Sequence, residues 1–182
     1  MMDYKAFSEL IEQRESCRNY DENRPVEREK LLNCLEAARI APSACNSQPW
    51  FFHAVTDAAR IEEIRKSVQE RGMNKFASKC PVLVVVTEEY AQLSPRVLEH
   101  VKRQDFASID IGLATAQFCL AATAQGLSTC ILGWLDEPKI QRIMEFPETR
   151  RVRLVLALGY AADDSHREKK RKAFDEMAAI YE

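Results

Sequence analysis

The chain has few glycines and lacks the short motifs that mark common nucleotide, metal and redox sites. It has only 5 glycines in 182 residues, and it contains neither a GxGxxG nor a GxxxxGK[ST] pattern. This absence argues against a dinucleotide-binding Rossmann unit and against a P-loop. Its six cysteines include no CxxC pair, and none of its three histidines stands at zinc-ligand spacing. We therefore expect neither a metal site nor an iron–sulfur cluster.

An excess of basic charge and a long apolar run are also missing. The 26 lysines and arginines are outnumbered by 28 aspartates and glutamates, which gives a net charge of −2. Broad nucleic-acid binding depends on surplus positive charge, so we do not expect it. No 18 consecutive residues are apolar, and the N-terminus lacks the order of a secretory signal. The sequence thus predicts no membrane span and no nucleic-acid partner, and we expect a cytoplasmic protein with reduced cysteines.

The spacing of apolar residues predicts one α+β domain over residues 1–182. The helical patterns cover residues 3–14, 26–40, a segment after Asp57, 105–125, a short segment after Asp136, and the tail from about Arg167. The strand-like runs cover residues 50–56, 81–87, 129–134 and 152–160. Because two helices precede the first strand and the βαβ rhythm is missing, the order favours a sheet with helices on both faces.

Two of these segments are apolar enough to predict where they lie. Residues 81–87 are a continuous, largely β-branched run, which is typical of a central strand covered on both faces. Residues 105–125 are apolar around much of the helix surface, so we expect this helix in the core or at a subunit interface.

A stiff polar loop over residues 41–50 is the most informative part of the chain. It reads Ala-Pro-Ser-Ala-Cys-Asn-Ser-Gln-Pro-Trp and lies between a helical pattern and a strand-like run. Its two prolines restrict the backbone, while Ser43, Asn46 and Gln48 supply hydrogen-bonding groups. Such a loop suits a flat polar ligand, although turn chemistry alone also produces this composition.

Three further segments carry groups suited to an anionic, planar ligand. In residues 14–18, Arg-Glu-Ser-Cys-Arg, two guanidiniums flank a hydroxyl and can hold a phosphate, or they are simply cations at a helix C-terminus. Gly133 at a strand end allows a ligand to approach the backbone, or it only connects a strand to the next helix. The basic run of residues 166–172 either contacts phosphate or is a solvated charged segment.

The order of these four segments resembles the nitroreductase family of FMN-dependent oxidoreductases. The similarity rests on Arg-x-Ser-x-Arg, Ala-Pro-Ser-x-x-Asn-x-Gln-Pro-Trp, a Gly-Trp strand end and a Lys-x-Arg tail, and it spans nearly the whole chain. The resemblance implies a three-layer α/β/α sandwich with a central mixed sheet, in an intertwined homodimer that holds FMN at the subunit interface. It also implies that NADH or NADPH reduces the flavin, which then reduces a small acceptor such as a nitroaromatic or a quinone.

The resemblance also implies which residues bind the cofactor, while no catalytic protein acid, base or nucleophile stands out. The matched positions are Arg14, Glu15, Ser16, Arg18, Pro42, Ser43, Asn46, Gln48, Leu132, Gly133, Lys169 and Arg171. Residues 14–16 and the two tail cations match the site of the phosphate and ribityl chain, which needs several cationic donors. The loop 42–48 matches a segment that the partner subunit lays against the ring, with Gln48 as a supporting residue. Leu132 and Gly133 match the backbone that faces flavin N5, and Arg18 matches a cation that favours the negative charge of the reduced ring.

Two alternatives to a reductase stay open. The same fold carries other FMN chemistry, such as ene reduction, dehalogenation, dehydrogenation and flavin processing. A non-catalytic flavin-binding module is favoured by the short chain and by the small region between residues 87 and 112, which leaves little room for a segment over the substrate.

Overall fold

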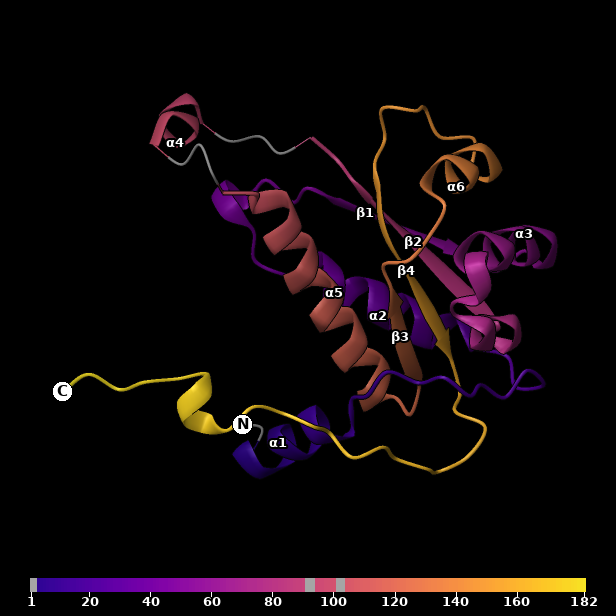
Figure 1. The fold of residues 1–182 in the computed structure, drawn as a ribbon, viewed down its shortest axis with the longest axis horizontal. Coiled ribbons are helices and arrows are strands. Elements are labelled where there is room, and N and C mark those ends of the chain that lie inside the picture. The colour runs from indigo at the N-terminus through magenta and orange to yellow at the C-terminus, as the bar shows by residue number, and fades with distance from the viewer. Residues whose placement is uncertain (1–2, 91–93, 101–103) are drawn as a thin grey trace.

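A four-stranded sheet separates two layers of helices (Figure 1). The computed structural model describes residues 3–90, 94–100 and 104–182. Its strands, in the spatial order β1-β2-β4-β3, are β1 (Trp50–Val55), β2 (Val82–Glu88), β4 (Val152–Gly159) and β3 (Ser128–Leu132). Each strand is antiparallel to its neighbour, and Val85 of β2 lies opposite both His53 and Val155.

The side chains of the central strands alternate between the two helical layers. Val84 and Val86 of β2 belong to one apolar cluster, while Leu83 and Val85 belong to the other, and all four are fully buried. Because successive strand residues point to opposite faces, a continuous apolar run fits a strand that is covered on both sides. The prediction of a central buried strand over residues 81–87 is confirmed.

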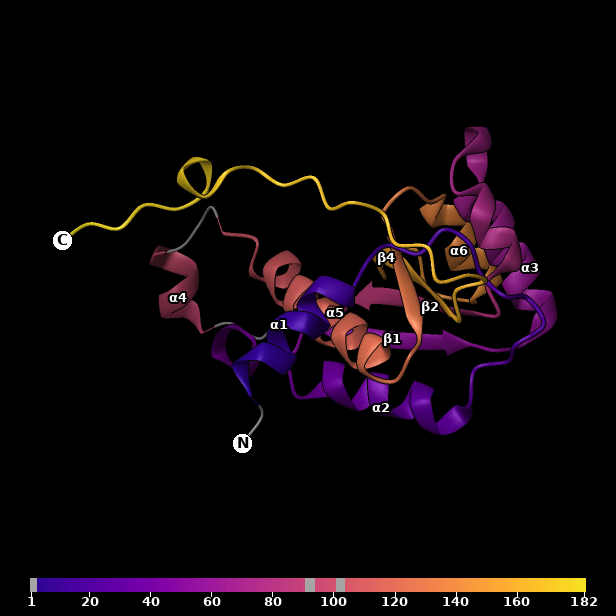
Figure 2. The ribbon, with the colours of Figure 1, turned by 90° about the horizontal axis from the view of Figure 1, so that it is seen from below.

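Two pairs of helices form the outer layers (Figure 2). One face is covered by α2 (Arg28–Arg39) and α5 (Phe106–Ala124), and the other by α3 (Ala58–Val68) and α6 (Glu137–Ile143). Aspartates begin α3, α5 and α6, because each carboxylate accepts a bond from the backbone N–H of the residue three positions later. The remaining helices are α1 (Tyr4–Gln13) and α4 (Pro95–His100). The three-layer α+β prediction is confirmed.

Parallel pairing in the sheet is limited to a single bridge in the described part of the chain. Ser16 pairs parallel with Thr129 beside β3, whereas the four strands themselves pair antiparallel. Apolar spacing predicts where strands lie but not which strands become neighbours, so the sequence could not give this pairing.

The prediction of a helix in the tail from about Arg167 is wrong. Over residues 161–182, all of which the structure describes, the backbone has one short 3₁₀ turn, Phe174–Glu176. Phe174, Met177 and Tyr181 have helical spacing but are strongly exposed, and the tail runs away from the body of the molecule (Figure 1). An amphipathic segment of this length needs a surface to pack on before it forms a stable helix.

α5 is long and apolar enough to cross a membrane by length and composition, even though no 18 consecutive residues are apolar. Its inner face, with Ile111, Ala114 and Phe118, packs into the apolar cluster of α2 and the sheet. This packing is that of a core helix. On its outer face Ile109 and Leu113 remain 50 % and 43 % exposed.

Candidate functional site

Residues 14–18 form a fixed segment beside the first residues of β3. The backbone N–H of Arg14 closes α1 by donating to Leu10 O at 3.0 Å. Ser16 then pairs with Thr129, and the backbone N–H of Cys17 donates to Thr129 O at 2.8 Å. Both arginines of the predicted Arg-x-Ser-x-Arg motif are therefore carried by a segment that is bonded to the sheet.

The C-terminal segment crosses residues 14–18 and the end of α1. His166 Nδ1 lies 3.7 Å from Glu15 Oε1, and the backbone N–H of Arg167 donates to Glu15 Oε2 at 3.3 Å. The Arg167 guanidinium donates to the carbonyl of Ser16. Lys169 Nζ donates to two carbonyls in the last turn of α1, including Ile11 O at 2.9 Å. Lys169 thereby satisfies carbonyls that have no partner within the helix, and its positive charge suits this helix end.

These two segments line an open cationic cavity of about 220 Å³. It is lined by Arg14, Glu15, Ser16, Arg18, Arg167, Glu168, Lys169 and Arg171. Five cations face two carboxylates, so the lining carries a surplus of positive charge. Burial, followed by the nearby guanidiniums of Arg14 and Arg171, lowers the pKa of Lys169. An anion in the cavity would relieve that repulsion, and the donor set matches what a phosphate group requires.

Arg18 reaches from this cavity toward the sheet and the segment before β2. Its Nη1 donates to Ser16 O at 3.5 Å, and its guanidinium carbon lies 5.9 Å from the centroid of the Phe76 ring. Burial raises the pKa of the Cys130 thiol in β3, and the positive charge of Arg18 partly offsets this effect. Arg18 thus lines the cationic cavity and also lies close enough to β3 for its charge to act on Cys130.

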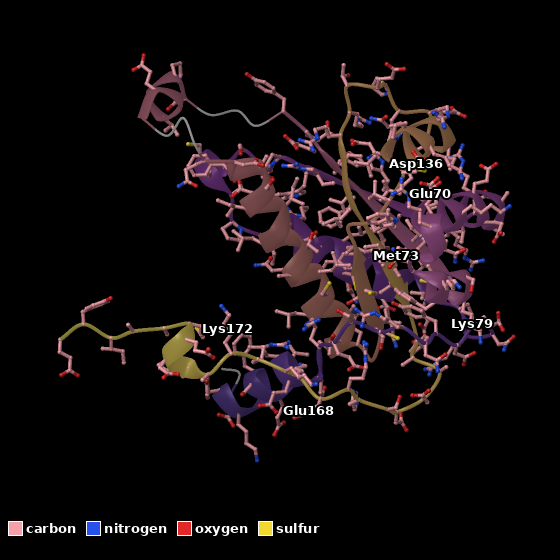
Figure 3. The ribbon with its side chains drawn as sticks, viewed as in Figure 1. Glu70, Met73, Lys79, Asp136, Glu168 and Lys172 are labelled. Carbon is pink, nitrogen blue, oxygen red and sulfur yellow. The ribbon has the colours of Figure 1, made fainter. Side chains whose placement is uncertain are left out.

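The Leu132–Gly133 strand end is open on one side and tied down on the other. A Cβ built on Gly133 would meet no atom within 4 Å, which leaves its backbone accessible. Trp134 donates its indole N–H to Glu70 O at 3.2 Å, and its carbonyl accepts from Asn74 Nδ2 at 3.3 Å. Figure 3 labels Glu70 and Met73 on this neighbouring segment. These bonds hold the turn that follows β3 in a defined position.

The polar loop has an unusual backbone. Cys45, Asn46 and Gln48 adopt left-handed φ values of 53°, 52° and 47°. This region costs a non-glycine residue roughly 1–2 kcal/mol, so three such residues in four positions store local strain. The surrounding contacts must hold the loop in this conformation.

Figure 1 shows the loop near one end of α5 and α1 near the other end, and Lys169 of the cationic cavity bonds to the last turn of α1. The backbone N–H of Ala44 bonds to Asp110 near the start of α5, whereas Gln13, at the end of α1, shares a cavity with Thr123 and Gly126 at the end of α5. Asp110 and Thr123 are 13 residues apart on α5 (123 − 110), so these two points are separated by roughly 20 Å along the helix. One chain therefore brings together the predicted residues of the phosphate site but leaves Pro42, Ser43, Asn46 and Gln48 apart from them.

Arg167 is a residue of the cavity that the sequence analysis did not single out. It belongs to the basic run of residues 166–172, in which Lys169 and Arg171 were selected by the resemblance. The run predicted cations near a phosphate, but its sequence does not indicate that Arg167 is the cation that bonds to the carbonyl of Ser16.

The sequence profile of the Nitroreductase family matches residues 11–72 and 69–160, and the chain belongs to this family. An oxygen-insensitive NADPH nitroreductase of Helicobacter pylori (strain J99) is 24 % identical over 202 residues, covering 96 % of each chain. A Caenorhabditis elegans iodotyrosine dehalogenase 1 homolog is 28 % identical over 205 residues, covering 97 % of this chain and 62 % of the relative.

Solved structures confirm the fold. A crystal structure of an Exiguobacterium sibiricum protein in complex with FMN has a TM-score of 0.82 and 22 % identity, covering 100 % of this chain and 98 % of that one. The predicted family and its sandwich fold are thus both confirmed.

Proposed function

We propose that this protein is an FMN-dependent oxidoreductase that takes hydride from NADH or NADPH and passes it to a small acceptor such as a nitroaromatic or a quinone. The cationic cavity carries the proposal, because it gathers Arg14, Ser16, Lys169 and Arg171 from opposite ends of the chain. Membership of the Nitroreductase family and the FMN complex of the Exiguobacterium sibiricum protein support it.

The residues of the cavity suit the phosphate end of FMN. Arg14, Lys169 and Arg171 would neutralise a dianionic phosphate, and the hydroxyl of Ser16 would donate to a phosphate or ribityl oxygen. Burial and then the positive charges of Arg14 and Arg171 lower the pKa of Lys169, and a bound dianion would offset the part that comes from those charges. The lining therefore fits the group chemically.

At the other end of the site, protein groups would have to hold and orient the flavin ring. FMN, when bound, would accept the hydride and pass it on. Arg18 would lie at the pyrimidine edge and stabilise negative charge there, while the accessible N–H of Gly133 would orient the ring. Trp134 and Asn74 would keep that N–H in place through their bonds to the neighbouring segment. We assign no proton-transfer role to a protein side chain.

A second copy of the chain would complete the site. The loop with Pro42, Ser43, Asn46 and Gln48 is too far along α5 to reach the cavity of its own chain, so a partner would have to supply it. The half-exposed Ile109 and Leu113 on α5 and the exposed apolar tail give such a partner surfaces to cover. We therefore propose an intertwined homodimer with FMN at the subunit interface. The six free cysteines suit the reducing cytoplasm, where we place the reaction.

A second candidate function is reductive dehalogenation with the same cofactor. The Caenorhabditis elegans relative, an iodotyrosine dehalogenase 1 homolog, supports it because the match covers 97 % of this chain. The two candidates share the FMN site and differ in the acceptor that enters after the flavin is reduced.

An anaerobic titration tests both candidates. The purified protein is saturated with FMN, and its visible absorbance is followed while NADH or NADPH is added; rapid bleaching is expected. A nitroaromatic, menadione or a halogenated tyrosine is then added, and the acceptor that restores the yellow colour fastest identifies the reaction. Protein that takes up no FMN contradicts the proposal, and bound flavin that neither nicotinamide bleaches points to a non-catalytic flavin-binding module.

A further inference from the structure

We propose that Arg167 is a positioning residue of the phosphate site, which docks the C-terminal segment on Glu15 and Ser16 and so brings Lys169 and Arg171 into the cavity. The inference rests on the proposed function, since the expected anion is the phosphate of FMN. The family resemblance matches Lys169 and Arg171 but not Arg167, and the basic run of residues 166–172 gives Arg167 no positioning role.

Arg167 contacts two consecutive residues that are far away in the sequence. Its backbone N–H donates to Glu15 Oε2 at 3.3 Å, and its guanidinium donates to the carbonyl of Ser16. Arg167 thus fixes the path of the tail through its backbone and is itself held in place through its side chain. A guanidinium suits this task because its donors have a fixed planar arrangement and keep their charge.

The segment that Arg167 contacts is bonded to the sheet. Ser16 forms the parallel bridge with Thr129, and the backbone N–H of Cys17 donates to the carbonyl of the same threonine at 2.8 Å. The carbonyl of Ser16 also accepts from Arg18 Nη1 at 3.5 Å. Arg167 therefore joins the tail to a segment that is bonded to β3 and that carries both arginines of the proposed site.

The tail is held on residues 11–19 by bonds of Ala162 and Asp163 to Asn19, of Arg167 to Glu15 and Ser16, and of Lys169 to the end of α1. It is exposed over most of residues 161–182, and Figure 3 shows Glu168 and Lys172 on the part that runs past α1. The Arg171 guanidinium donates to the carbonyl of its neighbour Lys170 at 2.8 Å. Because an extended, solvated segment loses conformational entropy when it is ordered, the contacts of Arg167 influence whether Lys169 and Arg171 stay at the cavity.

Affinities for FMN and riboflavin separate this role from a general structural one, because riboflavin lacks the phosphate. We would measure both dissociation constants for the wild type, R167Q and K170Q by quenching of flavin fluorescence. K170Q is the matched control, since Lys170 is an exposed cation in the same tail that does not line the cavity. In R167Q we expect FMN binding to weaken about tenfold, the effect of losing one charge-assisted contact, with riboflavin binding changed by less than about twofold. In K170Q we expect both constants to stay within about twofold of the wild type.

Tryptic cleavage of the tail in the flavin-free protein gives a second measurement. R167Q and K170Q each remove one tryptic site from the same basic run, so their cleavage rates are directly comparable. We expect faster cleavage at the remaining sites of R167Q, because its tail is no longer docked.

The outcomes distinguish this inference from the proposed function. R167Q and K170Q with equal FMN affinity or equal cleavage rates overturn the role of Arg167. So does an R167Q protein that loses FMN and riboflavin in the same proportion, which would indicate damage to the whole fold. Wild-type protein that binds FMN no tighter than riboflavin overturns the phosphate site itself, and with it the function proposed above.

Discussion

The buried carboxylate of Asp110 accepts a hydrogen bond from the backbone N–H of Ala44 at 3.1 Å. This bond ties the strained polar loop to α5, and Asp110 is only 3 % exposed. Ser43 Oγ completes the support by accepting from the backbone N–H of Gln48 at 3.0 Å. The conformation of the loop that we expect to face the partner's flavin therefore depends on its bond to the core helix α5.

Removing that carboxylate should release the loop. We expect Asp110→Ala to lower the free energy of unfolding by about 1–3 kcal/mol, because the N–H of Ala44 loses its partner and a buried side chain is lost. It should also weaken FMN binding by the dimer. Asp110→Asn keeps an acceptor oxygen and should lose less. Urea denaturation and flavin titration check both effects, with exposed Asp164→Ala as the control. Equal stability in Asp110→Ala and Asp164→Ala would contradict this account.

Arg18 should matter more than a surface arginine of equal charge. We expect Arg18→Ala to lower flavin retention or the rate of hydride transfer at least about tenfold, since it removes a permanent cation from the ring edge. Arg60→Ala should change either quantity by less than about twofold, because Arg60 is half exposed and its ion pair with Glu145 is a long surface pair of 4.0 Å. Stopped-flow reduction by NAD(P)H measures the rate, and equal effects of the two substitutions would refute the assignment.

The sequence predicted the layers better than it predicted contacts between distant segments. The β-branched run of β2 and the aspartates before α3 and α6 are local features, so they placed these elements correctly. The tail was wrongly predicted because Phe174 and Met177 have helical spacing but no surface to pack on. The order of the motifs in the chain predicted Arg14, Glu15, Ser16, Arg18 and the tail cations Lys169 and Arg171, and the structure brings them to one cavity. Arg167 was missed because its partners, Glu15 and Ser16, are more than 150 positions away.

His53 should make stability depend on pH in the mildly acidic range. Its Nε2 lies 3.0 Å from Thr87 Oγ1. Burial, followed by the charge of Arg150, lowers its pKa below the usual 6.5, with Glu89 acting in the opposite direction. The unfolded chain then binds the proton more readily than the native protein, so stability is fully present above pH 6.5 and is lost as the pH falls through the native pKa.

Urea denaturation between pH 5 and 7 measures this effect. The wild type should become more stable as the pH rises, and His53→Gln should reduce that slope, because a glutamine keeps a polar side chain that does not titrate in this range. An unchanged slope in His53→Gln would assign the pH dependence to other groups.

The C-terminal ten residues should contribute to dimerisation more than to the phosphate site. Truncation after Lys172 keeps Arg167, Lys169 and Arg171 but removes Phe174, Met177, Ile180 and Tyr181, which are all more than 60 % exposed in the single chain. Such a row of exposed apolar side chains is favourable only when a partner covers it. We therefore expect light scattering to show a dimer for the full chain. The truncated chain should have a larger dimer dissociation constant, and its affinity for FMN should fall as the dimer is lost. A stable full-length monomer that binds FMN tightly would show that one chain completes the site alone, and the loop at residues 42–48 would then have no place in it.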